Sequence, residues 1–339
     1  MASTIRDVAA YSGFSLGTIS KYINGGTVKE KTRLKIEEAI QKLKYKPNTI
    51  AKGLRNARSF TIGVLMSKLN SIFNAIIISS LEEYLLPLGY SVIVSECHEN
   101  ENMEIEKVNF LLHHMVDGIV IMPYSMSGKQ IEIIKESKVP FVVIDQILEQ
   151  YKVDGVVLDN AAAMEKPVEA LIKMGHRDIA ILTGSETLYT ARGRFTGFKK
   201  IMDHYKIPIH DQYVCNGGYS TDGGYAATLS LLNRKKPPSA LVVSNYDMTI
   251  GAVLAIHHLR KIIPDDISLI GFDNLPPINV VEPALSIISQ PMVEMGKSTG
   301  HLLFKRIKGD YSGYPELIIH NADVKLTESI KPLRKKHII

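Results

Sequence analysis

The sequence is poor in cysteine and has no long apolar run. Only Cys97 and Cys215 occur among 339 residues, which argues against a disulfide framework and against a zinc site of four thiolates. Apolar stretches such as 75–78 and 118–122 are far shorter than the roughly 18 residues of a membrane helix. The first residues also lack the basic start and apolar run of a secretory signal. We therefore expect two small buried thiols in a cytoplasmic protein without a membrane span.

Motifs of common enzyme classes are missing as well. There is no G-x-S-x-G and no H-E-x-x-H in the sequence. Residues 296–298, Gly-Lys-Ser, resemble the end of a phosphate-binding loop, but Pro291 stands five positions earlier and the string lies in an expected helix. The adjacent histidines at 113–114 and 257–258 point about 100° apart on a helix, so neither pair can share a metal ion. We expect no enzymatic activity, no cofactor and no metal site.

Charge is distributed unevenly along the chain. Residues 1–58 have a net charge of +8, residues 59–330 of −7 and the last nine of +4. A basic segment suggests a polyanionic partner, because Lys and Arg release counterions from phosphates. A solvated basic surface without a partner is the alternative. With 45% hydrophobic residues and mean hydropathy near zero, the chain is of ordinary globular composition, long enough for two domains and a small appendage.

Three short helices are predicted within the first 45 residues. Thr4-x-x-Asp7 is typical of a capping box before a helix that ends near residue 12. Ser15 can cap a second helix over 16–23, and Thr27-x-x-Glu30 predicts a third helix. Helices in this order, the first two joined by a tight turn, indicate a helix–turn–helix module. The apolar stripe of the third helix is expected to comprise Leu34, Ile36, Ala39, Ile40 and Leu43.

The second helix has an outward face suited to a DNA groove. If Ile19 and Ile23, four residues apart, point inward, the outward positions are those of a recognition helix. Lys21 can donate to guanine and Leu16 can contact a thymine methyl group. Gly17 lies on the same face but has no side chain to contact a base. Groups suited to phosphate oxygens are Thr18, Ser20 and Asn24.

After Phe60, short apolar strands alternate with amphipathic helices. Strands that are apolar throughout and separated by helices indicate parallel sheets covered on both faces. The pattern occurs in two series, which predicts an α/β body of two doubly wound lobes behind the all-α head. Strands are expected at 60–66, 90–95, 118–122, 140–145, 154–158, 178–183, 213–216, 240–244 and 267–272, with one or two more near 316–327. Helices are expected at 73–86, 101–114, 127–137 and 292–308.

Several spaced motifs resemble one family. IRDVAAYSGFSLGTISKYING, DGIVIMP, MGHRDIAILTG, PDDISLIGFDN and ISQPMVEMG follow the order found in the lactose-repressor (LacI/GalR) family of bacterial transcription regulators. The resemblance extends over essentially the whole chain. It implies a body like that of periplasmic sugar-binding proteins. The implied divisions are a DNA-binding head 1–46, a hinge 47–58, a body 59–330 with lobes 60–160 plus 291–321 and 161–290 plus 322–330, and a basic tail 331–339.

The resemblance also implies how the hinge acts. In this family the linker becomes helical on operator DNA, and a leucine from each subunit wedges into the minor groove, a position that Leu54 matches here. Simple packing of Leu54 in the hinge is the alternative. Tyr45 matches a phosphate-contacting tyrosine of the family, and Arg55 would meet the DNA backbone. The full set of expected DNA contacts is Thr4, Ser15, Leu16, Gly17, Thr18, Ser20, Lys21, Asn24, Tyr45, Asn48, Ala51, Leu54 and Arg55.

A ligand site between the lobes is the second implication. Arg194, Asp145 and Asp273 match the family's polar ligand contacts, and a guanidinium with carboxylates can hold hydroxyl groups. An interlobe salt bridge is the alternative for Arg194 and Asp273. Tyr246 departs from the family pattern and is expected to reshape the pocket. The remaining expected ligand contacts are Phe73, Tyr219 and Asn245, of which the two aromatic residues have core packing as their alternative.

Together these features predict a ligand-responsive repressor of a carbohydrate-catabolism operon. It would bind operator DNA as a homodimer, because one head covers half of a palindromic site, with dimer contacts including the helix at 73–86. The effector is expected to be a sugar or sugar acid. Two alternatives stay open: a ligand-binding protein with no gene-regulatory role, and a regulator that responds to a purine or another non-sugar effector.

Overall fold

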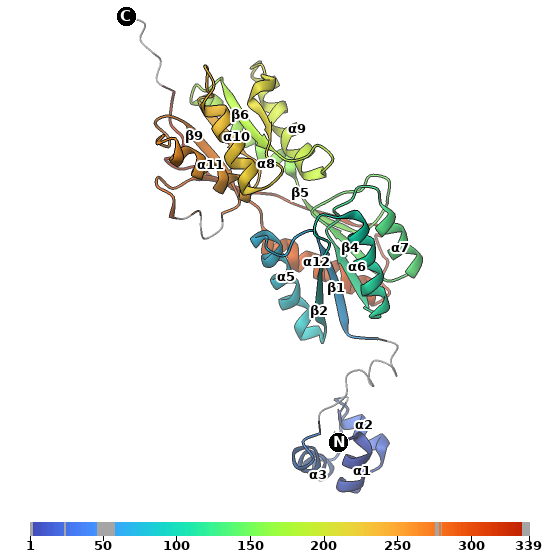
Figure 1. Cartoon of the computed structure of the whole chain (residues 1–339). Helices are drawn as coiled ribbons and strands as arrows, with labels where there is room; N and C mark the ends of the chain where they lie inside the picture. The colour runs from blue at the N-terminus through green and yellow to red at the C-terminus, as the bar shows by residue number, and fades with distance from the viewer. Residues whose placement is uncertain (1–2, 24, 46–57, 275–277, 279, 334–339) are drawn as a thin grey trace, which may run out of the picture. The chain divides into compact units, whose positions relative to one another are not determined.

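The computed structural model describes residues 3–23, 25–45, 58–274, 278 and 280–333. The chain divides into two compact units at residues 60 and 61. The first unit contains α1 (Ile5–Ser12), α2 (Leu16–Ile23) and α3 (Glu30–Lys42) (Figure 1). The predicted helix–turn–helix head is therefore confirmed.

Side chains near the predicted caps set the ends of the first two helices. The Asp7 amide donates to Thr4 Oγ1 (3.4 Å) and the Thr4 amide to Asp7 Oδ2 (2.7 Å), so the first capping box is present. The Thr18 amide donates to Ser15 Oγ at 3.3 Å. The predicted capping box Thr27-x-x-Glu30 is wrong, because the N-cap residue of α3 is Lys29, which makes no side-chain hydrogen bond there. Since the helix begins only at Glu30, Thr27 stands too early to cap it.

A small apolar core holds the three helices together. It consists of Val8, Ile19, Ile36 and Ala39, all fully buried. The expected stripe on α3 is correct except at Leu34, which is 54% exposed. Position 34 therefore lies on the solvent face of α3. Tyr22 on α2 donates to Glu37 of α3 at 2.6 Å, a link that the sequence patterns did not predict.

The second unit contains two sheets of six strands each. Their orders are β11-β5-β4-β3-β1-β2 and β12-β10-β9-β8-β6-β7, and every pair is parallel except the antiparallel β10–β12. We call the parts built on these sheets the first and second lobe. The strands are β1 (Thr61–Met66), β2 (Ser91–Glu96), β3 (Gly118–Ile121), β4 (Phe141–Ile144), β5 (Gly155–Leu158), β6 (Ile179–Thr183), β7 (Val214–Asn216), β8 (Ala240–Val243), β9 (Ser268–Phe272), β10 (Ser286–Ser289), β11 (Leu317–His320) and β12 (Asp323–Lys325).

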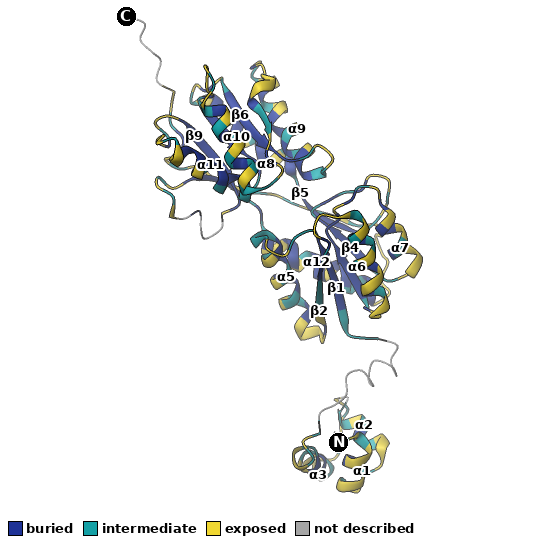
Figure 2. Ribbon diagram, viewed as in Figure 1, coloured by how far each residue is buried: buried dark blue, intermediate teal, exposed yellow. Residues whose placement is uncertain are grey.

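Helices cover both faces of each sheet (Figure 1). Within β6, Ile179 and Ile181 belong to the apolar cluster on one face, whereas Ala180 and Leu182 belong to the cluster on the other. The central strands are consequently buried on both sides (Figure 2). The helices are α5 (Ile72–Leu85), α6 (Glu101–His113), α7 (Lys129–Ser137), α8 (Asn160–Lys173), α9 (Tyr189–His204), α10 (Thr221–Leu232), α11 (Tyr246–His258) and α12 (Met292–Ile307), with short 3-10 turns η1 (Leu86–Leu88) and η2 (Asp211–Tyr213).

This architecture confirms the predicted fold class, with one strand missed. The run 286–289 forms β10 between β9 and β12, although the sequence patterns assigned no strand there. Its two apolar residues, Ile287 and Ile288, stand between two serines, which is too short an apolar run to stand out. All other expected strands occur, with shifts of one or two residues at their ends.

The Gly-Lys-Ser string at 296–298 serves helix packing. A Cβ at Gly296 would lie 2.7 Å from the Ile77 carbonyl oxygen, so glycine lets α12 approach α5 closely. Lys297 pairs with Glu83 at 3.5 Å and Ser298 contacts His320 at 3.1 Å. The side chains of the string thus have structural partners within the first lobe.

The two cysteines differ in burial, and the helices are short or polar. Cys97 is buried, and burial raises the pKa of its thiol to about 11, whereas Cys215 is only partly buried, so the expectation of a buried thiol is wrong there. No helix in the described part of the chain is long and apolar enough to span a membrane.

Candidate functional site

A polar pocket of about 190 Å³ lies where segments of both lobes meet. Its walls come largely from residues that follow the carboxyl ends of parallel strands, the edge at which α/β sheets usually bind ligands. Asp145 follows β4, Asn245 follows β8 and Asp273 follows β9. All six predicted ligand contacts line this pocket: Phe73, Asp145, Arg194, Tyr219, Asn245 and Asp273.

Arg194, on α9, is buried at the centre of a hydrogen-bond network. Its Nε donates to Asn160 Oδ1 (2.8 Å), Nη1 to the Ser244 carbonyl (2.5 Å) and Nη2 to Gln290 Oε1 (3.4 Å). The guanidinium carbon also lies 4.0 Å from the centre of the Phe272 ring. These contacts fix the plane of the guanidinium, so its orientation is set before any ligand arrives.

Gln290 connects this network to a carboxylate. Its Nε2 donates to both oxygens of Asp273 at 3.1 Å. Among the described residues no ion pair within 4.0 Å joins Arg194 to Asp273, and both belong to the second lobe, Arg194 on α9 and Asp273 directly after β9. The alternative of an interlobe salt bridge between these two residues is therefore wrong.

Asp145 approaches the same guanidinium from the first lobe. Burial raises the pKa of Asp145 to about 7, an effect that Arg194 opposes and Asp273 reinforces. Burial likewise raises the pKa of Asp273 to about 6, against the opposing effects of Arg194 and Gln290. Oδ1 of Asp145 is buried without a hydrogen-bond partner among the described residues. A buried oxygen of this kind is costly unless a donor reaches it.

The aromatic and amide groups of the pocket have mixed roles. Tyr219 packs against the core of the second lobe, and its ring lies where a Cβ on Gly184 would be. Its hydroxyl oxygen is buried without a partner in the described part of the chain. Phe73 is half-buried on α5. Asn245 caps α11 by accepting from the Met248 amide at 2.9 Å. Tyr219 thus combines core packing with a place in the pocket wall.

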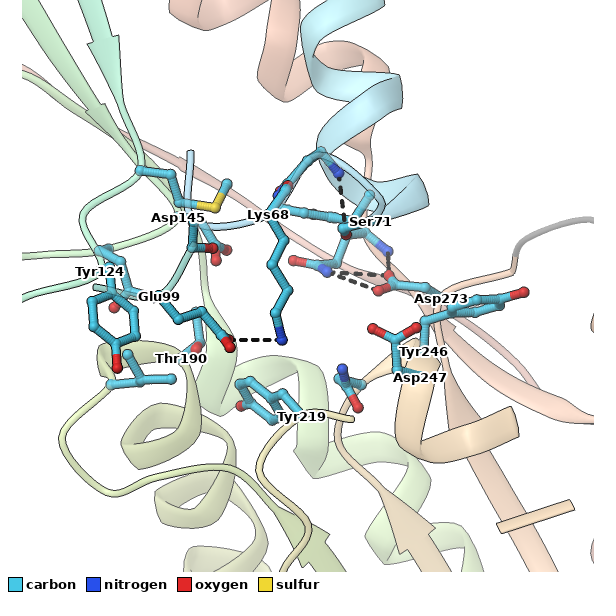
Figure 3. A pocket seen from close by; sticks show the side chains of 18 of the residues that line it. Lys68, Ser71, Glu99, Tyr124, Asp145, Thr190, Tyr219, Tyr246, Asp247 and Asp273 are labelled. Atoms are coloured by element: carbon cyan, nitrogen blue, oxygen red, sulfur yellow. Dashed lines mark hydrogen bonds and ion pairs between the residues drawn. The ribbon is translucent and has the colours of Figure 1, made fainter. Parts of the chain in front are cut away.

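Sequence patterns missed several charged and polar groups of the pocket. Lys68 and Glu99 face each other at 2.8 Å (Figure 3). Tyr246, which departs from the family pattern, lines the pocket, and so does the adjacent Asp247. Most of the missed residues also follow strand ends, a signal that could have found them. The further lining residues are Ser67, Ser71, Asn74, Met122, Pro123, Tyr124, Gln146, Leu188, Thr190, Gly218 and Gln290.

The predicted DNA-contacting face of α2 is open to solvent. Leu16, Gly17 and Lys21 are exposed, and Leu16 is an apolar side chain with 45% of its surface accessible. Ser15 and Thr18 share a hydrogen bond at 3.0 Å. A shallow groove runs between this helix and the start of α3, lined by Ser15, Gly17, Thr18, Lys21, Thr27, Val28, Lys29 and Thr32.

The other predicted DNA contacts have different surroundings. Thr4 is exposed, and its hydroxyl group contacts Asp7 at 2.8 Å. Ser20 is half-buried on α2, and Tyr45 packs against the core of the head. Outside the described residues lie Asn24, Asn48, Ala51, Leu54 and Arg55.

A helix–turn–helix head, together with a two-lobed α/β body that has a polar pocket at the strand ends, defines a class of DNA-binding regulators that respond to small molecules. Family models agree: residues 4–48 match bacterial regulatory proteins of the lacI family, and residues 168–319 match a periplasmic binding protein-like domain.

Known proteins are similar over most of the chain. Catabolite control protein A of Priestia megaterium is 32% identical over 308 residues, covering 90% of this chain and 92% of that protein. The Lac repressor dimer bound to operator and the anti-inducer ONPF matches with a TM-score of 0.87 at 26% identity, covering 97% and 99%. A regulator from Enterococcus faecium with bound ribose matches with a TM-score of 0.73 at 28% identity, covering 81% and 100%. The chain belongs to the LacI family of bacterial transcription regulators.

Proposed function

We propose that this regulator is a repressor that binds operator DNA as a homodimer and changes its affinity when a small polyhydroxylated effector enters the pocket. The Lac repressor match, a dimer on operator DNA, and the ribose-bound regulator support this proposal. The protein has no enzymatic role and acts in the cytoplasm, where the operator is accessible. Dimer contacts include α5.

The exposed face of α2 is the proposed base-contacting surface. Lys21 supplies a donor for guanine, and Leu16 supplies an apolar contact for a thymine methyl group. Around them, Ser15 and Thr18 offer hydroxyl groups to phosphates, which position the head without specifying sequence. The basic residues of the head add a salt-dependent attraction to any duplex.

Arg194 is the observation on which the effector proposal rests. Its guanidinium is buried and oriented by three hydrogen bonds, and it faces carboxylates from both lobes. Hydroxyl groups of a ligand can donate to Asp145 and Asp273 and accept from Arg194. An effector that binds two lobe arrangements unequally shifts their populations. Coupling of about 1 to 3 kcal/mol would change operator affinity by roughly 5- to 150-fold.

A thermal-shift screen followed by operator titration tests this function. A bound effector raises the melting temperature by mass action, and the same compound should change operator affinity in fluorescence anisotropy. We expect a sugar or a related polyol to do both. If a purine instead raises the melting temperature and changes operator affinity, the effector is a purine and not a sugar. Binding without any change in operator affinity would contradict the coupling.

Leu54→Ala tests the proposed wedge in the hinge. Loss of an apolar side chain that opens a base step should weaken operator binding by tenfold or more, because the kinked DNA is no longer stabilised. Nonspecific binding, which depends on phosphate contacts, should stay within about twofold. An unchanged operator affinity would remove Leu54 from the mechanism.

A further inference from the structure

Carboxylates outnumber cations in the described lining of the pocket. Its acids are Glu99, Asp145, Asp247 and Asp273, and its basic side chains are Lys68 and Arg194. Figure 3 shows Lys68 extending across the pocket toward Glu99, with Asp145 to one side and both Asp247 and Asp273 to the other. A ligand between these groups meets more negative than positive charge.

Both cations already have partners in the protein. Lys68 Nζ lies 2.8 Å from Glu99 Oε1. Arg194 donates three hydrogen bonds within the second lobe. Its charge also opposes the burial that raises the pKa values of Asp145 and Asp273, and so is already shared between two carboxyl groups. Little positive charge is therefore left to bind a carboxylate or phosphate of a ligand.

Two carboxyl groups of the lining have an oxygen or a charge without a direct partner among the described residues. The buried Oδ1 of Asp145 accepts no hydrogen bond from any described residue. Asp247, in the first turn of α11, has no Lys, Arg or His nitrogen within 4.0 Å in the described ranges. Burial raises the pKa of Asp247, and only the more distant Lys68 opposes this effect.

We propose that the effector is a polyhydroxylated molecule with one protonated amine, such as an amino sugar, whose positive charge is compensated by Asp145 and Asp247. This proposal rests on the proposed effector function of the pocket and restricts its ligand class. Hydroxyl groups of the ligand meet Arg194 and Asp273, while the ammonium group meets the carboxyl groups of Asp145 and Asp247. Sugar acids and sugar phosphates are disfavoured, because their anionic groups would approach these same carboxylates.

An anionic ligand that binds through Lys68 is the opposing possibility. It lies beside Ser71, the N-cap of α5, and a phosphate there could attract the ammonium group away from Glu99. The Lys68–Glu99 pair is partly exposed, so such an exchange is physically accessible. An anionic ligand would then bind more tightly than its neutral parent, which is the reverse of the proposed order.

Matched compounds on three scaffolds distinguish these possibilities. Isothermal titration of the full-length protein would compare glucose, galactose and mannose with their 2-amino derivatives, the N-acetyl forms of these amines, the corresponding uronic acids and the 6-phosphates. N-acetylation removes the charge of the amine but keeps its nitrogen. We expect at least one amine to bind tenfold or more tightly than both its parent sugar and its N-acetyl form. No acid or phosphate should bind more tightly than its parent.

Asp247→Asn and Asp222→Asn form a matched pair of variants. Both aspartates stand in the first turn of a helix, Asp247 on α11 at the pocket and Asp222 on α10 at the surface. Asp247→Asn should reduce the preference for amine over parent sugar about tenfold, because the amide cannot compensate the charge of the ammonium group. Asp222→Asn should leave the preference unchanged.

The outcomes distinguish failure of the amine requirement alone from failure of the effector proposal as a whole. Tighter binding of an acid or phosphate, or equal binding of amine and parent, would overturn the amine requirement while leaving a sugar-responsive regulator. An undiminished preference in Asp247→Asn would also overturn it. If no compound of any series binds, both the ligand class and the proposed sugar-type effector fail.

Discussion

The carboxyl groups of Asp145 and Asp273 titrate near neutral pH. Burial raises their pKa values to about 7 and about 6, and the shared Arg194 only partly opposes this effect. Both groups come close to the same guanidinium from different lobes. The pocket thus stores unfavourable electrostatic energy that a hydrogen-bonding ligand can relieve.

Stability should therefore depend on pH through these residues. Because the folded pKa of Asp145 exceeds its unfolded value, the folded state binds more protons between about pH 4 and 7, and the free energy of unfolding falls as pH rises through this window. A domain of this size loses about 2–4 °C in melting temperature per kcal/mol. Calorimetry of the full chain at pH 5 and pH 8 should show the decline, and Asp145→Asn should reduce it. If the melting temperature of this variant falls with pH as steeply as that of the unchanged protein, Asp145 is not the source of the pH dependence.

Arg194→Lys separates ligand binding from DNA binding. Lysine keeps the charge beside Asp145 and Asp273 but loses the planar fork that donates to Asn160 and Gln290. We expect the ligand-induced rise in melting temperature to disappear and the operator affinity of the ligand-free protein to stay within threefold. A normal ligand isotherm in this variant would exclude Arg194 as a ligand contact.

The six pocket residues predicted from the sequence came from a resemblance, because strand-end positions alone do not show which of them share one site. Asp145 and Asp273 follow buried strands, so their place at the strand ends was foreseeable. Lys68, Glu99 and Asp247 belong to three distant segments. Pairing between such segments depends on tertiary contacts that no local pattern encodes, and the charge balance of the pocket emerges only from the fold.

Helix α2 packs one face against the core of the head and exposes the other face to solvent. Ile19 is fully buried, while Leu16 and Lys21 face solvent on the same helix. Gly17 weakens this helix, because glycine costs about 1 kcal/mol relative to alanine. A Cβ there would meet only Ser15 Oγ, at 3.9 Å, so the structure itself does not require glycine at this position.

Alanine at Gly17 and at Gly26 should have opposite effects. Gly17→Ala should slow hydrogen exchange of α2 amides in the full chain about fivefold, in line with a gain of about 1 kcal/mol. Gly26→Ala should accelerate it, because its Cβ would lie 2.6 Å from Lys21 Cγ and 2.8 Å from the Lys21 carbonyl oxygen. Faster exchange in Gly17→Ala would show that the packing of α2 is misassigned.

Elements with long or repeated patterns were predictable, and isolated ones were not. Strands such as β3 and β4 are apolar at every position because both faces are covered. The start of α3 was placed too early because a capping pattern at Thr27 satisfied local chemistry, while the chain begins the helix only after Lys29. Strand β10 can be recognised as a strand only from its pairing with β9 and β12, which the local sequence does not show.

At the scale of the whole body, the chain crosses repeatedly between the lobes. β11 completes the first sheet and the following β12 completes the second. Direct contacts also join the lobes near the pocket: the Tyr189 amide donates to Gln146 Oε1 at 3.1 Å, and Arg192 lies 3.5 Å from Glu149. Ligand binding at this junction can therefore bias the arrangement of the lobes, which is the physical basis of the proposed switch.

The most direct measurement is a competition titration of the full-length protein on fragments of its source genome against random duplex, at two salt concentrations and with each effector compound. We expect one fragment to bind at least a thousandfold more tightly than random DNA, with an affinity that falls steeply as salt rises and changes when the effector is added. Equal binding to all fragments, whichever compound is present, would contradict sequence-specific operator binding by this protein.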